Sequence, residues 1–325
     1  MADVFAYLEG FGVSGGSPNK STIIVTAPTG STVTCKMGST TKTATEKNAV
    51  WTFGGLDLGT WTITSTKGGD SATQDVAITR LTVEYVTIVY RITPEFAYTG
   101  DYEIVDDSDN PISDFASWKN NWKIRFLTSG TLTFTKLNGW NGQLDVFLVG
   151  GGGNGETIRG ARGGGGGYTK TVKGISIAIA TPYTVTIGAS SGTSSAFGAS
   201  ANGASGANGG SGGGGGGSSS GTPGNGGSNG GNGTAGNVSQ GGAGQVTTTK
   251  EFGESTGKLY SGGGGGSAAG AGAAGDSTAG AGANFGGAAK NGVANTGGGG
   301  GGAYDGTAGR GGSGIAIIRN ARGAA

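Results

Sequence analysis

The chain has 325 residues and a formal net charge of +1, with 21 Lys and Arg against 20 Asp and Glu. This balance argues against binding to nucleic acid or to an anionic membrane surface, because both attract an excess of positive charge. Histidine, the commonest general base and metal ligand, is absent, so we expect no enzyme, no cofactor and no metal site.

The first residues and the single cysteine indicate where in the cell the protein is made and whether it forms a disulfide bond. The opening MADVFAYLEGFGVSGG lacks the basic and apolar regions of a signal peptide, so we expect synthesis in a cytoplasm without a secretion signal. No apolar run reaches the length of about 18 residues that crosses a bilayer, which predicts no membrane insertion. Cys35 has no second cysteine with which to form a disulfide, and we interpret it as a small buried residue.

Residues 21–91 are predicted to form a small β-sandwich. Segments such as STIIVTA, VWTFGGL and GTWTITST are rich in Val, Ile, Thr and Trp, and turn sequences separate them every 8–12 residues or so. Trp51 and Trp61 are expected in the core of this sandwich. The pattern also resembles immunoglobulin-like modules of the carboxypeptidase-regulatory type, and that resemblance implies a spacer.

Residues 92–187 are predicted to form a second β domain, completed by a strand at 314–320. NWKIRF and TLTFTK are expected to pair as a hairpin about Ser129-Gly130. SGIAIIRN at the far end must also pair, and we expect it between LDVFLV and YTVTI. The acidic residues of this domain lack the spacing of a calcium loop, so we interpret them as a solvated turn. They are Asp106, Asp107, Asp109 and Asp114.

Glycine divides the chain into two parts: residues 1–149 hold 15 of the 78 glycines, and residues 150–325 hold 63. Within 188–313, glycine recurs every third residue in some tracts and fills others completely. A flexible linker has no use for this spacing. A collagen triple helix needs far more proline than this region contains. The motif G-x-G-x-x-G at Gly150, Gly152 and Gly155 precedes no helix, which argues against a dinucleotide site.

The remaining interpretation of 188–313 is a bundle of polyglycine type II helices. Such a helix has three residues per turn and no internal hydrogen bonds, so neighbouring helices must bond to one another. Pure glycine runs, 163–167, 212–217, 262–266 and 297–302, are expected inside the bundle, and the triplet tracts outside it. Chain reversals are expected where glycine becomes sparse, around 190–197, 218–222, 246–260, 276–279, 284–296 and 303–305.

The glycine-rich half resembles a known family. LDVFLVGGGGNG, GGGGGYTKT, PYTVTIGAS, NTGGGGGG and GGSGIAIIRN follow one another in an order similar to the glycine-rich domain near the ends of many bacteriophage tail-fibre and structural proteins. The resemblance covers about 120–325. It implies a virion protein, at the tail or particle surface, whose bundle loops recognise a receptor on the host cell.

The resulting hypothesis is an all-β phage tail-fibre or receptor-binding protein. Residues 1–20 would dock to other virion proteins, the sandwich would act as a spacer, and loops would contact a host glycan or outer protein. We expect a homo-oligomer. The alternative is a structural fibre, capsid-decoration or surface-filament subunit without a receptor role. The expected contact residues are concentrated in 249–260 and are Lys250, Phe252, Lys258, Tyr260, Phe285 and Tyr304.

Overall fold

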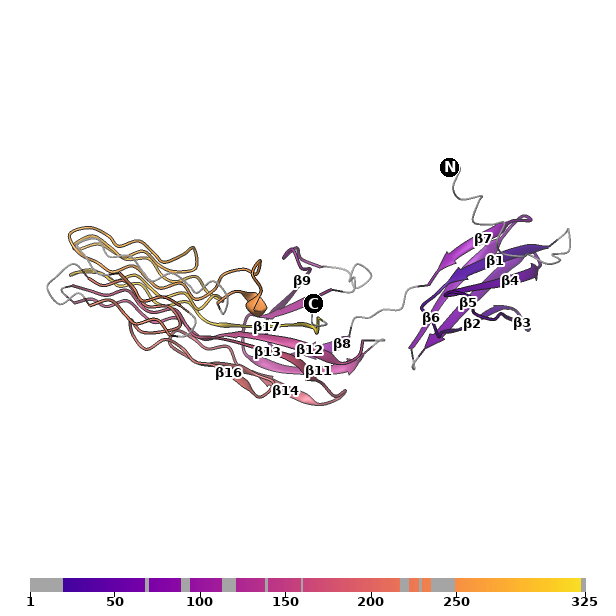
Figure 1. Ribbon diagram of the computed structural model, residues 1–325, viewed down its shortest axis with the longest axis horizontal. Helices are drawn as coiled ribbons and strands as arrows, with labels where there is room; N and C mark the ends of the chain where they lie inside the picture. Colours follow the sequence, from indigo (N-terminus) through magenta and orange to yellow (C-terminus); the bar gives the residue numbers. More distant parts are fainter. Residues whose placement is uncertain are drawn as a thin grey trace. The chain divides into compact units, whose positions relative to one another are not determined.

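The computed structural model divides the chain into two units, Met1–Ile92 and Thr93–Ala325, which are described separately (Figure 1). Strands dominate, and no α-helix occurs in the part of the chain that the structure describes. The expected docking segment 1–20 lies outside that part, apart from Lys20. The described residues are 20–67, 70–88, 94–112, 121–137, 140–158, 160–216, 222–227, 230–234 and 249–322.

The first unit is a sandwich of two sheets, with strand orders β4-β1-β7 and β3-β2-β5-β6. Alternate residues of β1, β2, β4 and β5 face a shared core, which includes Trp51, Trp61 and Cys35 as the sequence predicts. Burial raises the pKa of the Cys35 thiol to about 11. The strands are β1 (Ser21–Thr26), β2 (Thr32–Met37), β3 (Thr40–Thr43), β4 (Val50–Leu56), β5 (Gly59–Lys67), β6 (Asp70–Ile78) and β7 (Val83–Thr87).

The second unit contains a five-stranded sheet of order β13-β12-β17-β10-β9 and a three-stranded sheet of order β14-β11-β8, with a small β15-β16 hairpin. A core that includes Trp122, Phe126 and Phe134 is shared by strands of both larger sheets. The strands are β8 (Glu95–Tyr98), β9 (Tyr102–Val105), β10 (Lys123–Phe126), β11 (Gly130–Lys136), β12 (Gln143–Val149), β13 (Thr169–Ser176), β14 (Pro182–Val185), β15 (Ser194–Ala196), β16 (Ala199–Ala201) and β17 (Ile315–Asn320).

Two expected pairings in this unit are wrong. Strands β10 and β11 belong to different sheets, so the turn at Ser129-Gly130 connects two sheets and makes no hairpin. Strand β17 pairs with β12, as expected, but its other neighbour is β10, and the YTVTI segment pairs instead with β11. The burial patterns give the reason: β17 is buried on both faces, as a central strand must be, whereas β14 is half-exposed.

The glycine runs form a bundle that extends from one end of the second unit's sheets (Figure 1). In the run 163–167, the first and fourth amides donate to carbonyls of the run 211–214. The second and fifth donate to 297–300, and the middle one donates to Gly206, with N···O distances of 2.8–2.9 Å. A neighbour that recurs every third residue is the signature of a helix with three residues per turn.

The same runs leave no room for side chains. A methyl group on Gly163, Gly164 or Gly167 would lie 2.0 Å from a carbonyl oxygen of another run, far inside van der Waals contact. The described residues of all four pure glycine runs are buried, so they occupy the interior as expected. Backbone contact replaces side-chain packing throughout this bundle.

Turns of the bundle gather at two ends. Turns at 276–279 and 293–296 lie at the sheet end, since the amides of Thr296 and Gly297 donate to Ser313, two residues before β17. The opposite end, called the tip below, includes among the described residues the turns at 156–158, 268–270, 284–287 and 303–306. The expected reversal 284–296 is therefore two turns, at opposite ends, joined by a straight run.

A glycine-to-alanine substitution in the interior tests the bundle. Gly164→Ala would place its methyl group 2.0 Å from the Gly153 carbonyl oxygen. We expect a loss of about 3 kcal/mol or more. That loss lowers the melting temperature of the second unit by about 6–12 °C in calorimetry. In the control Gly287→Ala, the nearest atom lies 3.1 Å away. Equal stability of the two variants would contradict the close backbone packing.

Candidate functional site

The structure separates the six expected contact residues into two groups. Phe285 and Tyr304 lie in turns at the tip of the bundle. Lys250, Phe252, Lys258 and Tyr260 lie in the segment 249–260, which packs on the five-stranded sheet. The sequence analysis concentrated the expected contacts in 249–260 and added Phe285 and Tyr304 outside it, and the structure keeps these two groups apart.

Strand alternation explains why 249–260 packs on the sheet. One face of β12 and β17 contributes to the core between the sheets, and the other face presents Phe147, Val149, Ile315 and Ile317. This second face would be an apolar surface in water without a cover. The segment 249–260, with a single 3₁₀ turn at Glu251–Gly253, covers it.

Phe252 and Tyr260 are therefore buried, with exposed fractions of 2% and 1%. Their ring centroids lie 6.0 Å and 5.4 Å from that of Phe147. Burial raises the pKa of the Tyr260 hydroxyl well above its usual range. As exposed receptor contacts these two residues are wrong predictions, because their side chains complete a core.

The lysines of the segment differ from the aromatic residues. Lys258 is exposed, and its ammonium lies 5.6 Å from the centroid of the Tyr260 ring, within the range of a cation–π contact. The ammonium of Lys250 donates to the carbonyl oxygen of Ser255, which closes the segment on itself. Lys258 therefore remains available for a contact, whereas Lys250 holds the loop.

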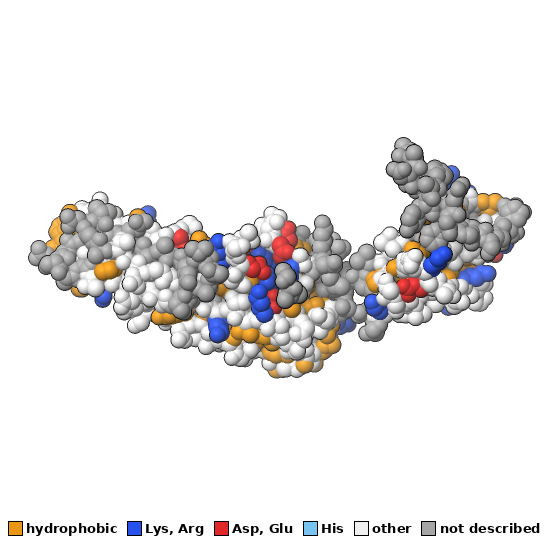
Figure 2. Space-filling view, in the orientation of Figure 1, with side chains coloured by type: hydrophobic (Ala, Val, Ile, Leu, Met, Phe, Trp, Pro, Cys, Tyr) orange, Lys and Arg blue, Asp and Glu red, His pale blue; other side chains and the backbone are white. Residues whose placement is uncertain are grey.

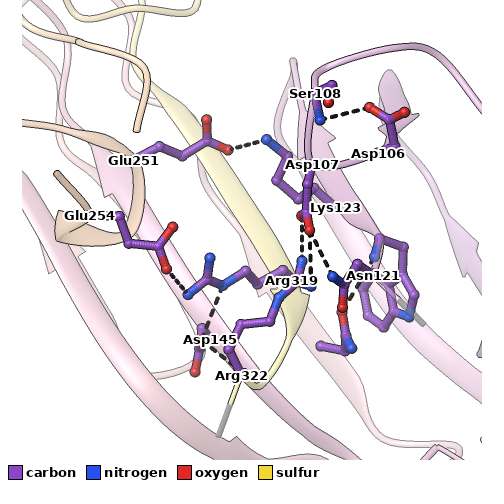
Figure 3. A network of polar contacts seen from close by, with 12 residues as sticks. Asp106, Asp107, Ser108, Asn121, Lys123, Asp145, Glu251, Glu254, Arg319 and Arg322 are labelled. Atoms are coloured by element: carbon purple, nitrogen blue, oxygen red, sulfur yellow. Dashed lines mark hydrogen bonds and ion pairs between the residues drawn. The ribbon is translucent and has the colours of Figure 1, made fainter. Parts of the chain in front are cut away.

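The other end of the same sheet face carries buried charges (Figure 3). Lys123 and Arg125 alternate along β10 with the core residues Ile124 and Phe126, so both cations point to the covered face. The Lys123 ammonium lies 2.5 Å from Asp109 and 3.1 Å from Glu251. The Arg125 guanidinium lies 2.5 Å from Asp109 and 3.6 Å from Glu251.

A second set of ion pairs centres on Arg319 of β17. Its Nε lies 3.1 Å from Asp145, the directly opposite residue on β12, and its Nη2 lies 2.6 Å from Glu254. Its guanidinium carbon also lies 4.0 Å from the centroid of the Phe252 ring. Arg322 completes the set with two contacts to Asp107, of 2.6 Å and 3.2 Å. Glu251 and Glu254 thus attach 249–260 to the sheet.

These charged residues surround a cavity of about 550 Å³, which is within the range of small-ligand sites. Figure 2 shows their blue and red side chains gathered in one patch of the second unit, whereas the bundle surface is mostly uncharged. The cavity is lined by Asp107, Ser108, Asp109, Asn121, Lys123, Glu251, Phe252, Glu254, Thr256, Gly257, Lys258, Arg319 and Arg322.

The ion pairs lower the pKa values of two carboxyl groups, those of Glu254 and Asp109. A hydrogen bond from Arg319 holds the pKa of Glu254 below its ordinary value of 4.5. Burial acts to raise the pKa of Asp109, but hydrogen bonds from Arg125 and Lys123 outweigh it, so this pKa lies below 3.8. Both carboxylates are therefore ionised at neutral pH. The acidic run expected to be a solvated turn contributes Asp107 and Asp109 to the pairs, and Asp114 lies outside the described residues.

The tip is the second candidate region. Phe285 is 62% exposed and stands edge-on to Tyr304, with ring centroids 4.9 Å apart. Ile158, also 62% exposed, lies in the adjacent turn, in which Glu156 pairs with Arg162. Backbone hydrogen bonds of 2.8–2.9 Å connect the turns: Ala303 donates to Glu156, and Gly286 donates to Tyr304.

Sequence reasoning missed the charged cavity. Three of its cations, Lys123, Arg319 and Arg322, lie in or beside segments that read as ordinary strands, and the fourth is Lys258. Its acids come from segments far apart in sequence. One signal was present: NWKIRF places Lys and Arg at alternate positions of an otherwise apolar strand, which marks a buried face that needs anions. Among the described residues, no cluster of His, Cys, Asp and Glu is suited to a metal ion. Nor does any helix there have the length and apolar character to cross a membrane.

The fold and its glycine pattern define a class of protein: an all-β chain whose second unit carries a backbone-bonded glycine bundle. A family model described as a glycine-rich domain matches residues 127–321, more than half of the chain. The chain therefore belongs to this glycine-rich domain family.

Other comparisons add little. Comparison with curated proteins gives no match. Among solved structures, the crystal structure of a DUF3823 family protein from Bacteroides ovatus is 12% identical over 56% of this chain and 94% of that one. Its TM-score is 0.19, which is too low to support any argument about fold or function.

The aromatic cover makes a stability prediction. Phe252→Ala would empty a space over the sheet, and we expect it to lower the free energy of unfolding of the second unit by about 3–5 kcal/mol. Leu259→Ala, at a neighbouring position that is 37% exposed, is the control, with an expected change within about 0.5 kcal/mol. Denaturant unfolding measures both. A loss no larger for Phe252→Ala than for the control would contradict the burial.

The depressed pKa of Glu254 makes a pH prediction. Since its pKa is lower in the folded than in the unfolded chain, its contribution is present above the unfolded value of 4.5 and is lost as the pH falls through the folded value. We therefore expect the second unit to lose stability as the pH falls below 4.5 and through the lower folded pKa of Glu254. The variant Glu254→Gln should be less stable at neutral pH and should show a shallower loss in acid. Equal slopes in calorimetry at several pH values would contradict the ion pair.

Proposed function

We propose that this chain is a phage virion protein, a tail-fibre or receptor-binding protein that attaches the particle to its bacterial host through the tip. The observation that supports it is the exposed Phe285 side chain, held edge-on against the half-buried Tyr304 at the far end of the bundle. Membership of the glycine-rich family is consistent with the proposal, as is the resemblance to the domain of phage tail-fibre proteins.

The physical argument concerns where recognition can occur. Interior runs exclude every side chain, so the bundle can carry chemistry only at its turns and on its outer rods. The sheet-end turns are occupied by bonds to neighbouring segments, such as Val293 to Thr278. The tip turns present a large aromatic and a large aliphatic side chain to solvent. Aromatic residues are enriched at the centres of binding interfaces, and here backbone bonds order the turn that carries Phe285 before contact.

The proposed partner is a glycan or a protein of the bacterial outer surface. In this scheme the first unit is a spacer, and residues 1–20 dock to other virion proteins. Oligomerisation of the fibre is part of the same proposal. The alternative, a structural subunit without a receptor role, predicts that the purified chain does not bind host cells.

Cell binding tests the tip. We expect the double variant Phe285→Ala with Tyr304→Ala to bind host cells about 30-fold more weakly than the wild type, the equivalent of about 2 kcal/mol. Ile179→Ala is the matched control, because Ile179 is 49% exposed and lies in the connection that follows β13. Fluorescently labelled full-length chain and flow cytometry give the readout. A wild type that binds no host of the parent particle, or a double variant that binds equally well, would reject attachment through the tip.

A further inference from the structure

The charged cavity beside 249–260 has a property that the proposed attachment does not use: its charges cancel. Four acids line it, Asp107, Asp109, Glu251 and Glu254. Four bases line it as well, Lys123, Lys258, Arg319 and Arg322. No net field attracts a ligand of either sign.

The buried charges are also already paired with one another. Lys123 is shared by Asp109 and Glu251, Arg319 holds Glu254, and Arg322 holds Asp107 at distances of 2.5–3.1 Å. A charged ligand that displaced the Lys123–Glu251 pair, whose two side chains are both buried, would leave a buried charge uncompensated, which is strongly unfavourable. A ligand without charge meets no such penalty.

Hydrogen-bonding capacity nevertheless remains. Glu251 is 4% exposed and lines the cavity, yet its Oε1 accepts no hydrogen bond and is satisfied only by the ion pair with Lys123. The Nε of Arg322 is buried without a hydrogen-bond partner. A buried acceptor and a buried donor without hydrogen bonds carry an energetic cost. Both atoms have almost no accessible surface, so a ligand supplies the missing partners only if these side chains turn toward the cavity.

The rim of the cavity adds further donors and acceptors. Ser108, Thr256 and Lys258 are exposed and line the opening. Each hydroxyl can donate and accept, and the ammonium donates. The lining thus offers mixed donors and acceptors, no net charge and little apolar surface.

We propose that this cavity binds an uncharged saccharide. Sugar hydroxyls both donate and accept, so they can bridge the paired carboxylates and guanidinium groups without separating them. A volume of about 550 Å³ accommodates a small ligand of this kind. The inference does not depend on attachment through the tip, because the cavity and the tip lie at different ends of the bundle.

An oligosaccharide array tests the inference with the full-length chain. The array carries neutral, acidic and amino oligosaccharides, and calorimetric titration measures the affinity of the strongest neutral one. We expect the neutral sugars to bind preferentially. Binding of no neutral sugar, or a preference for charged sugars, overturns the proposal.

Variants locate the binding. Thr256→Val and Lys258→Ala alter the rim without breaking an ion pair. Each should lower the affinity for the neutral sugar about tenfold. Glu251→Gln removes the buried carboxylate and should lower the affinity for the sugar at least as much. Calorimetric unfolding of this variant checks that the second unit is folded. Affinity unchanged by all three variants overturns the proposal.

Two control variants test whether sugar binding is confined to the cavity. Lys290→Ala removes an exposed lysine from the bundle and should leave sugar affinity unchanged. The tip double variant should also leave it unchanged, so failure of the cavity and failure of the tip are distinguishable. A loss of sugar affinity in the tip variant would place the binding at the tip and overturn the cavity as its site.

Discussion

The glycine bundle of the second unit depends on one constraint: most of its interior amides find their partners on the backbone of neighbouring runs. A three-residue helix has no internal hydrogen bonds, so each run must be surrounded by others at backbone contact distance. Glycine is required because any side chain would occupy the position of a carbonyl oxygen. Shape in this bundle is fixed by hydrogen-bond geometry, and apolar burial is confined to the sheets from which the bundle extends.

That constraint also sorts the side chains. Interior runs carry none, so large side chains are found at the tip, where Phe285 and Ile158 are exposed, and over the sheet, where 249–260 is held. The two regions differ in chemistry. The tip exposes Phe285 and Ile158 beside one ion pair, whereas the cavity beside the sheet is lined by charged residues of both signs and is recessed.

Composition and periodicity were sufficient to predict the first sandwich, the glycine bundle and the reversals around 190–197, 276–279 and 303–305, because each depends on local spacing. Most of the expected reversal 218–222 lies outside the described residues. The partners of β17 were only half predicted, since pairing between strands far apart in sequence depends on which faces remain uncovered. The same limit applied to 249–260. A glycine-poor interruption was interpreted as an exposed loop, but Phe252 and Tyr260 cover the second face of β12 and β17. That face could be recognised in advance, because LDVFLV and GIAII are apolar on both sides.

The central position of β17 has a consequence for biosynthesis. Its partners β10 and β12 emerge from the ribosome more than 160 residues earlier, yet the five-stranded sheet has a gap in its middle until residues 315–320 arrive. Such long-range closure makes folding slow and leaves apolar edges unpaired in the nascent chain. The bundle lies between β12 and β17 in the sequence. Pairing of β17 with β12 therefore holds both ends of the glycine-rich segment at the sheet in one step.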